Sequence, residues 1–244
     1  MKKIIIGNWK QNPKTSKEAL KIISSIKPNK NIEMVVCPPF PFLSIFSKKG
    51  SLKIGAQDVS NIKEGAHTGE VGASMLKSVG VDYVIVGHSE RRSLGDTGEV
   101  VATKANLVLK NKMSPVICIG EKERHHDGEH WAVISRELHA SLSGISKADI
   151  KKVVIAYEPI WAIGSHSKGA MKVEDIAESV IFIRKVLSEM YSNKIAHDVR
   201  VVYGGSVDVS DASSISLDGG VSGFLIGRES LNPKHFDKIA LFLK

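Results

Sequence analysis

The segment VVIAYEPIW, residues 153–161, is the stretch that best indicates the fold, because it joins an apolar run directly to a carboxylate and a proline. Its first four residues, 153–156, are apolar without a break. A strand of this kind is buried on both faces, which is typical of a parallel sheet covered by helices. Pro159 keeps Glu158 out of the helical region of backbone space. The segment therefore predicts a buried parallel strand with an aimed carboxylate at its end.

Short β-branched runs of similar character recur along the whole chain, and each ends in Gly, Pro, Asn, His or a polar turn. We expect strands at 3–8, 33–37, 53–57, 83–87, 116–120, 153–157, 200–203 and 223–227. Amphipathic helical spacing lies between most of them, at 18–26, 100–109, 131–142 and 176–190. Asn232 as a cap and Pro233 at the first helical position predict the last helix.

Eight strands alternating with helices, with no Pro/Gly/Ser-rich linker, predict an α/β fold. The specific expectation is a single-domain (β/α)₈ TIM barrel that spans residues 1–244. A doubly wound open sheet is the alternative.

Composition excludes several classes of protein. With 244 residues, 42% hydrophobic and 25% charged, the chain matches soluble globular proteins and not disordered ones. The N-terminal apolar run 4–6 is too short for a signal peptide, and no run approaches the ~18 apolar residues of a membrane span. Cys37 and Cys118 suit free thiols in a reducing compartment, although one bridge between them stays open. We expect a soluble, cytoplasmic protein without membrane contact.

The net charge of +8 favours an anionic partner, either nucleic acid or a small anionic substrate. The lysines are spread along the chain without a basic run, and few aromatic residues stand among them. Such spacing is typical of solvated helix faces. We therefore expect a small anionic substrate and no nucleic acid.

In such a barrel the catalytic groups follow the strands, on the loops at one end. Lys10 follows the first run, His88 the fourth and Glu158 the sixth. Each has a plain structural alternative: a surface lysine, a helix cap and an ion-paired carboxylate. An acid at an apolar barrel mouth is also suited to act as a general base.

The seventh run ends in Gly204-Gly205-Ser206 and the eighth in Gly227-Arg228. The loops after these two strands are the usual phosphate site of such barrels, where bare backbone N–H groups meet the anion. The small and flexible segment 162–169 follows the rigid Pro-Ile-Trp start and predicts a lid.

Two patterns suggest cofactors and are rejected. His125, His126, Glu129 and His130 lack the order of a zinc-binding helix motif. The glycines of 219–223 precede a strand, whereas those of a dinucleotide loop follow one. We expect neither a metal nor a nucleotide cofactor.

Several motifs together resemble the triosephosphate isomerase family, in order and at its spacing: GNWKQN (7–12), HSERR (88–92), CIGE (118–121), AYEPIWAIG (156–164) and YGGS (203–206). GAHTGE (65–70) is similar to the family's dimer-forming loop. The resemblance implies interconversion of dihydroxyacetone phosphate and D-glyceraldehyde 3-phosphate, in glycolysis and gluconeogenesis. It also implies a homodimer, formed through the loop from Gly65 to Glu70, with no metal or organic cofactor.

The resemblance implies a role for each site residue. Glu158 would take a proton from the carbon next to the carbonyl and return it to the neighbouring carbon, through an enediolate. Neutral His88 would polarise that carbonyl and shuttle protons between the two oxygens of the enediolate. Lys10 would supply positive charge, Asn8 would help to position it, and Glu90 would support Lys10.

The phosphate would be held by backbone N–H groups of Gly164, Ser206, Gly227 and Arg228. Arg228 stands where the family usually has a second glycine, so its side chain either points away from the phosphate or adds a contact.

Two other functions remain open at this point. The first is a different phosphosugar barrel, such as an epimerase or an indole-pathway enzyme, which would share the phosphate loops but not AYEPIWAIG. The second is a non-catalytic scaffold or basic binding module. The joint presence of Lys10, His88 and Glu158 argues against the scaffold.

Overall fold

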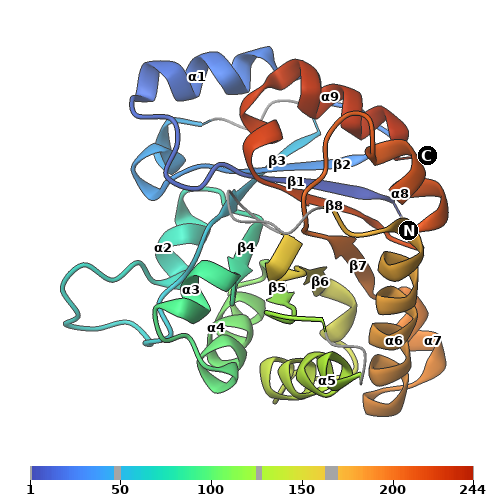
Figure 1. Ribbon diagram of the computed structural model, residues 1–244. Helices are drawn as coiled ribbons and strands as arrows, with labels where there is room; N and C mark the ends of the chain where they lie inside the picture. The colour runs from blue at the N-terminus through green and yellow to red at the C-terminus, as the bar shows by residue number, and fades with distance from the viewer. Residues whose placement is uncertain (1, 47–50, 125–127, 163–169, 244) are drawn as a thin grey trace.

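Eight parallel strands close into a barrel in the computed structural model, which describes residues 2–46, 51–124, 128–162 and 170–243. Each strand pairs with the next one in the chain, and the last pairs with the first (Figure 1). The predicted (β/α)₈ TIM barrel is confirmed, and the open-sheet alternative is wrong because an open sheet has no such closing pair. The domain boundaries at 1 and 244 stay a prediction.

The elements follow the expected alternation of strand and helix. The strands are β1 (Ile4–Asn8), β2 (Glu33–Cys37), β3 (Leu52–Ala56), β4 (Tyr83–Val86), β5 (Ser114–Ile119), β6 (Val154–Tyr157), β7 (Arg200–Tyr203) and β8 (Gly223–Ile226). The α-helices of the described residues are α1 (Ser16–Ser25), α2 (Ala73–Ser78), α3 (Ser89–Ser93), α4 (Gly98–Lys110), α5 (Glu129–Ser141), α6 (Val173–Met190), α7 (Asn193–Asp198), α8 (Ala212–Asp218) and α9 (Pro233–Phe242). Short 3₁₀ helices are η1 (Phe40–Ile45), η2 (Ile150–Lys152), η3 (Ile160–Ala162) and η4 (Arg228–Leu231).

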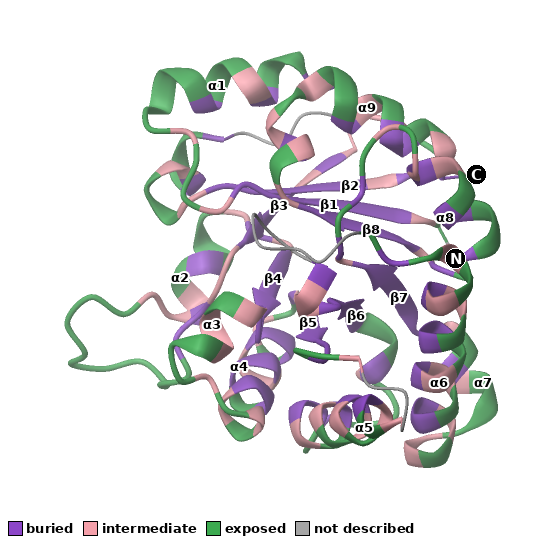
Figure 2. Cartoon of the chain, viewed as in Figure 1, coloured by how far each residue is buried: buried purple, intermediate pink, exposed green. Residues whose placement is uncertain are grey.

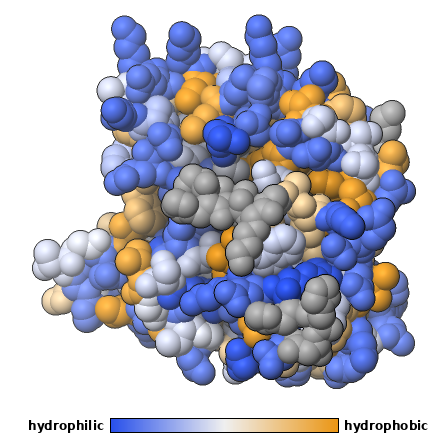
Figure 3. Space-filling model, in the orientation of Figure 1, coloured by the Kyte–Doolittle hydropathy of each residue, from blue (hydrophilic) through white to orange (hydrophobic). Residues whose placement is uncertain are grey.

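The strands are apolar on both faces because they separate two cores. Alternate side chains fill the inside of the barrel, for example Val154 and Ala156 on β6. The residues between them, such as Ile155 and Tyr157, belong to the core that the helices cover. Figure 2 shows the strands buried along most of their length, while the helices are buried on the barrel side and exposed on the other. Hydrophilic side chains are spread over the outer surface on this side of the molecule (Figure 3). The uninterrupted apolar runs of the sequence follow from this double burial.

The long helices match the expected segments, and the start of α9 has the predicted cap. The side-chain oxygen of Asn232 accepts the N–H of Lys234 at 3.1 Å, and Pro233 occupies the first helical position. The sequence missed α2, α7 and α8, each six or seven residues long. Helices this short are marginal on their own and are held by packing on the barrel. A periodic pattern cannot be read from so few residues.

Cys37 and Cys118 are both free and buried, so the free-thiol interpretation is confirmed and the disulfide alternative is wrong. They point into the barrel interior from β2 and β5. Burial raises the pKa of both thiols, since a thiolate would lose its water there. Within the described ranges, no helix is long and apolar enough to cross a membrane.

The closure between β8 and β1 leaves no room for a side chain at Gly223. A Cβ atom there would overlap the carbonyl oxygen of Ile4, and the φ of Gly223 is +148°. We expect Gly223→Ala to lower the free energy of unfolding by about 2–4 kcal/mol in urea denaturation, since backbone must move against backbone.

Gly72→Ala is the matched control, because a Cβ at Gly72 would meet nothing within 4 Å. It should cost less than about 1 kcal/mol. Equal stability losses in the two variants would contradict the close approach at the closing pair.

Candidate active site

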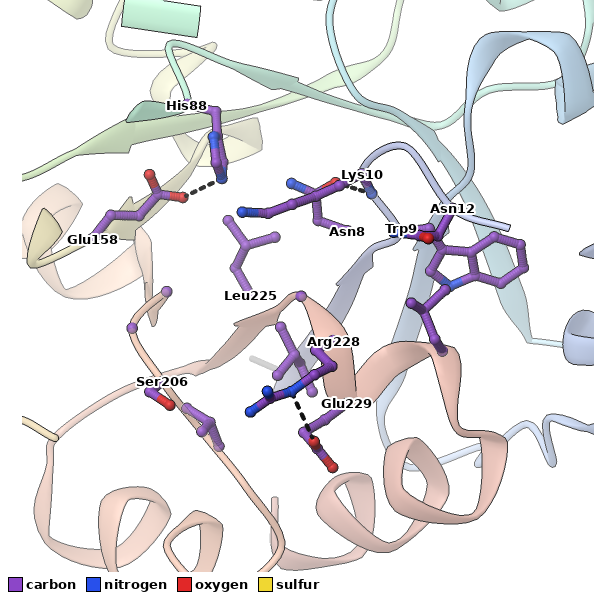
Figure 4. Close-up of a pocket in the computed structure, with 16 residues that line it drawn as sticks. Asn8, Trp9, Lys10, Asn12, His88, Glu158, Ser206, Leu225, Arg228 and Glu229 are labelled. Carbon is purple, nitrogen blue, oxygen red and sulfur yellow. Dashed lines mark hydrogen bonds and ion pairs between the residues drawn. The ribbon is translucent and has the colours of Figure 1, made fainter. Parts of the chain in front are cut away.

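A cavity of about 410 Å³ opens where the carboxyl ends of the strands meet. Its wall is drawn from the segments after β1, β4, β6, β7 and β8 (Figure 4). The lining residues are Asn8, Trp9, Lys10, Asn12, His88, Glu158, Gly204, Gly205, Ser206, Val207, Leu225, Ile226, Gly227, Arg228, Glu229 and Leu231. Most residues that the sequence assigned to a site lie here. Glu90 lies beside the cavity, bound to Lys10. Of the predicted lid, 162–169, residues 163–169 lie outside the described residues, and Gly164 is one of them.

Glu158 is fixed at the end of β6 with its carboxylate buried. Its backbone N–H donates to the carbonyl of Ile119 at 2.8 Å, and Pro159 follows it. The chain passes so close to Gly120 that a Cβ atom there would overlap the Glu158 carbonyl oxygen. Gly204 leaves space on the other side, since its Cβ would lie 2.8 Å from the Cγ of Glu158. The carboxylate is therefore held by backbone packing on two sides.

His88 faces Glu158 across the cavity, with its Nε2 atom 3.4 Å from Oε1 of the carboxylate. His88 caps α3, and its Nδ1 atom accepts the backbone N–H of Glu90 at 3.2 Å. An atom that accepts a hydrogen bond carries no proton, so the neutral ring bears its proton on Nε2. The other carboxylate oxygen of Glu158 accepts the N–H of Ser89 at 3.2 Å. The start of α3 thus orients both the imidazole and the carboxylate.

Lys10 has left-handed backbone geometry, with a φ of +51°. For a residue other than glycine this costs about 1–3 kcal/mol, so the surroundings must hold it. The side chain of Asn8 accepts the Lys10 N–H at 3.0 Å. The side-chain amide of Gln57 donates to the carbonyls of Lys10 at 2.8 Å and of Cys37 at 2.9 Å. The two polar side chains clamp the strained residue from both of its peptide groups.

The ammonium of Lys10 lies 2.6 Å from a carboxylate oxygen of Glu90. Burial favours the neutral form of Glu90, but the hydrogen bond from Lys10 and the charges of His88 and Lys10 outweigh it and lower the pKa of this carboxyl. The side chains of Lys10 and Glu90 are 34% and 60% exposed, so the pair adds little stability. Its effect is to aim the ammonium into the cavity beside His88 (Figure 4).

Sequence reasoning missed Gln57 and Glu121 as residues that support the site. Gln57 was taken only as the end of a strand; a polar residue directly after an apolar run was the available signal. Glu121 is buried after β5, where one of its oxygens accepts from the Tyr157 hydroxyl and the Trp161 indole, both at 2.9 Å. It anchors the first residues of the segment that follows Glu158.

The suggested metal cluster has no counterpart in the described residues. His125 and His126 lie outside them, and His130 is buried on α5 with its ring centroid 4.2 Å from that of Trp131. His130 therefore belongs to an aromatic cluster between helices.

The barrel and its cavity define the class of protein. A buried carboxylate, an imidazole and an ammonium converge where bare backbone can meet an anion, so the chain is an acid–base enzyme of the (β/α)₈ class. The comparisons with known proteins narrow this further. The family model described as triosephosphate isomerase matches residues 3–243.

Curated relatives carry the same name. A triosephosphate isomerase of Alkaliphilus oremlandii is 41% identical, over 96% of this chain and 97% of that protein. One from Dictyoglomus thermophilum is 39% identical over the same shares, and one from Alkaliphilus metalliredigens is 38% identical over 99% of each chain. The chain belongs to the triosephosphate isomerase family, and the predicted resemblance is confirmed.

The clamp on Lys10 can be tested at Gln57. In Gln57→Leu the Lys10 carbonyl loses the amide donor and the Cys37 carbonyl keeps the N–H of Trp9, so we expect about 1–3 kcal/mol less stability in urea denaturation. The lysine should also lose its fixed position, with turnover on glyceraldehyde 3-phosphate falling on the order of 10-fold or more.

Gln11→Leu is the matched control, since it makes the same chemical change at an exposed residue next to Lys10. It should change stability by less than about 0.5 kcal/mol. If Gln57→Leu kept full turnover, the amide would not be what positions Lys10.

Proposed function

We propose that this isomerase interconverts dihydroxyacetone phosphate and D-glyceraldehyde 3-phosphate, in glycolysis and gluconeogenesis. The observation that carries the proposal is the facing pair of Glu158 and His88, 3.4 Å apart at the buried end of the cavity. A base and a neutral hydrogen-bond donor at this separation can act on neighbouring atoms of one small substrate.

The reaction is a proton transfer with no change in the number of electrons. The Glu158 carboxylate takes a proton from the carbon beside the carbonyl, and the electron pair of that C–H bond becomes the C=C bond of an enediolate. The proton then returns from Glu158 to the neighbouring carbon. The proton on Nε2 of His88 passes to the carbonyl oxygen as negative charge develops there. The ring then takes the proton of the neighbouring hydroxyl, whose oxygen becomes the new carbonyl oxygen.

Lys10 supplies positive charge to the same oxygen. The geometry supports this role, because its ammonium lies between the cavity and Glu90, and Asn8 holds its backbone. Glu90 keeps the lysine aimed and does not touch the substrate. No step of the proposal uses a metal or an organic cofactor.

The phosphate binds at the other end of the cavity, to backbone N–H groups of Ser206, Gly227 and Arg228. These residues line the cavity wall after β7 and β8. Gly164, which the sequence assigns to the same group, would complete the site from the segment outside the described residues.

The base can be tested with Glu158→Asp, which retracts the carboxylate by about 1 Å. We expect turnover to fall on the order of 100-fold or more while the fold is kept. The assay follows dihydroxyacetone phosphate formed from glyceraldehyde 3-phosphate by purified protein.

Glu99→Asp, the same change at an exposed residue of α4, should leave turnover unchanged. Full turnover in Glu158→Asp would remove Glu158 from the role of base. No turnover by correctly folded wild-type protein would overturn the isomerase and favour the scaffold.

We further propose a cytoplasmic homodimer in which each chain acts as one domain, from residue 1 to 244. The loop between β3 and α2 extends from the body of the barrel (Figure 1), and residues 61–70 are all exposed. A cavity of about 420 Å³ beside it is lined by Phe40, Arg91 and Leu94, among others. The exposed loop and the open pocket lie beside each other on the same face, so the loop Gly65 to Glu70 of a second copy is the fitting occupant of the pocket.

The interface can be tested at Leu94, whose exposed fraction is 75%. Light scattering should give twice the 26.5 kDa chain mass for the wild type and one chain mass for Leu94→Asp, since a buried unpaired charge opposes association. Leu217→Asp, at an equally exposed leucine of α8, should remain a dimer. A monomeric wild type would contradict the proposal.

A further inference from the structure

Arg228 is an unusual residue for the wall of a phosphate site, because a long cation stands where bare backbone is sufficient. It follows β8 as the first residue of η4 and lines the cavity together with Ser206 and Gly227. Its side chain is 91% exposed, so no packing force holds it against the protein. In Figure 4 it extends from η4 toward the loop that carries Ser206.

A short chain of polar contacts limits where the guanidinium can lie. The Nε atom of Arg228 is 3.7 Å from Oε1 of Glu229, and Oε2 of Glu229 is 2.6 Å from Nδ1 of His235. Glu229 is thereby fixed from α9, and its side chain is 21% exposed. The contact with Glu229 is made by Nε, so it leaves the two terminal nitrogens of the guanidinium for another partner. That fork matches the spacing of phosphate oxygens.

The charged side chains around the cavity indicate what the Arg228 guanidinium does at the phosphate end. Among the lining residues that the structure describes, two carry a lysine or arginine side chain, Lys10 and Arg228. Lys10 lies at the catalytic end, beside Glu90. At the phosphate end the nearest carboxylate is Glu229, which also lines the cavity. Without a cation beside it, Glu229 would repel a dianion. Arg228 screens Glu229 and adds attraction.

We propose that the Arg228 guanidinium binds the substrate phosphate directly, in addition to the backbone N–H groups, and sets the preference for a phosphorylated over an uncharged triose. This inference rests on the proposed function. Arg228 is then a specificity-determining residue of the binding end, and the proton transfers at Glu158 and His88 do not depend on it.

The test compares Arg228→Gln, which keeps a polar side chain but removes the charge, with Arg228→Lys, which keeps the charge without the fork. Lys185→Gln is the matched control, since it removes one exposed positive charge on α6, away from the cavity. Inorganic phosphate is the probe. Its dissociation constant is measured by calorimetry at low and high salt, together with kcat/KM for glyceraldehyde 3-phosphate and for unphosphorylated glyceraldehyde.

We expect Arg228→Gln to weaken phosphate binding about 3- to 10-fold at low salt, because one charge-assisted contact in water is lost. The preference for the phosphorylated substrate should fall by a similar factor, with KM rising more than kcat falls. Arg228→Lys should lie between the wild type and Arg228→Gln, and Lys185→Gln should match the wild type. The difference should shrink at high salt.

Unchanged phosphate binding in Arg228→Gln would overturn the inference and leave the isomerase intact. Equal losses with both substrates would do the same, since they indicate a structural effect. Failure of the proposed function is a separate result: the wild type would not isomerise the phosphorylated triose, while calorimetry would still report on Arg228.

Discussion

The closing contact between β8 and β1 is the constraint on which the site depends. Lys10 follows β1 and Arg228 follows β8, at opposite ends of the chain, and they share one cavity only because these strands are paired. Ile4 pairs with Gly223 and Gly7 with Ile226, so the register is fixed over the whole of β8. A slip by one residue would exchange the inner and outer faces of the strand. It would also turn the following loop away from the cavity.

Glycine residues make the close packing around the site possible, because they let backbone approach backbone where a side chain would not fit. Gly120 admits the chain at Glu158, and Gly204 admits the Glu158 side chain itself. The carboxylate is therefore positioned by excluded volume, by the N–H of Ser89 and by the facing imidazole of His88.

The sequence predicts those features that follow from local rules. The apolar segment 153–156 and the restriction of Glu158 by Pro159 foretell a buried strand with an aimed carboxylate, and Asn232 with Pro233 foretells the start of α9. It does not predict Gln57, because the importance of that amide arises from the carbonyls of Lys10, just after β1, and of Cys37 at the end of β2. The sequence also does not predict the left-handed backbone of Lys10. The conformational preferences of lysine disfavour it, and contacts in the assembled barrel stabilise it. The same holds for short helices such as α8, which exist through packing.

The distribution of charge explains how a protein with a net charge of +8 can serve a dianionic substrate with so few cations in its site. Lys10 is paired with Glu90, and Arg228 lies beside Glu229. Glu158 contributes a further negative charge. The charges of these side chains thus nearly cancel. In the proposed site, close binding of the phosphate therefore depends on backbone dipoles and on Arg228. The excess of lysines elsewhere on the surface attracts the anionic substrate over a distance of about 8 Å at physiological salt. This attraction raises the rate at which substrate and protein meet. Strong cations inside the cavity would add attraction that also slows product release, whereas a diffuse surface charge attracts the substrate without holding the product.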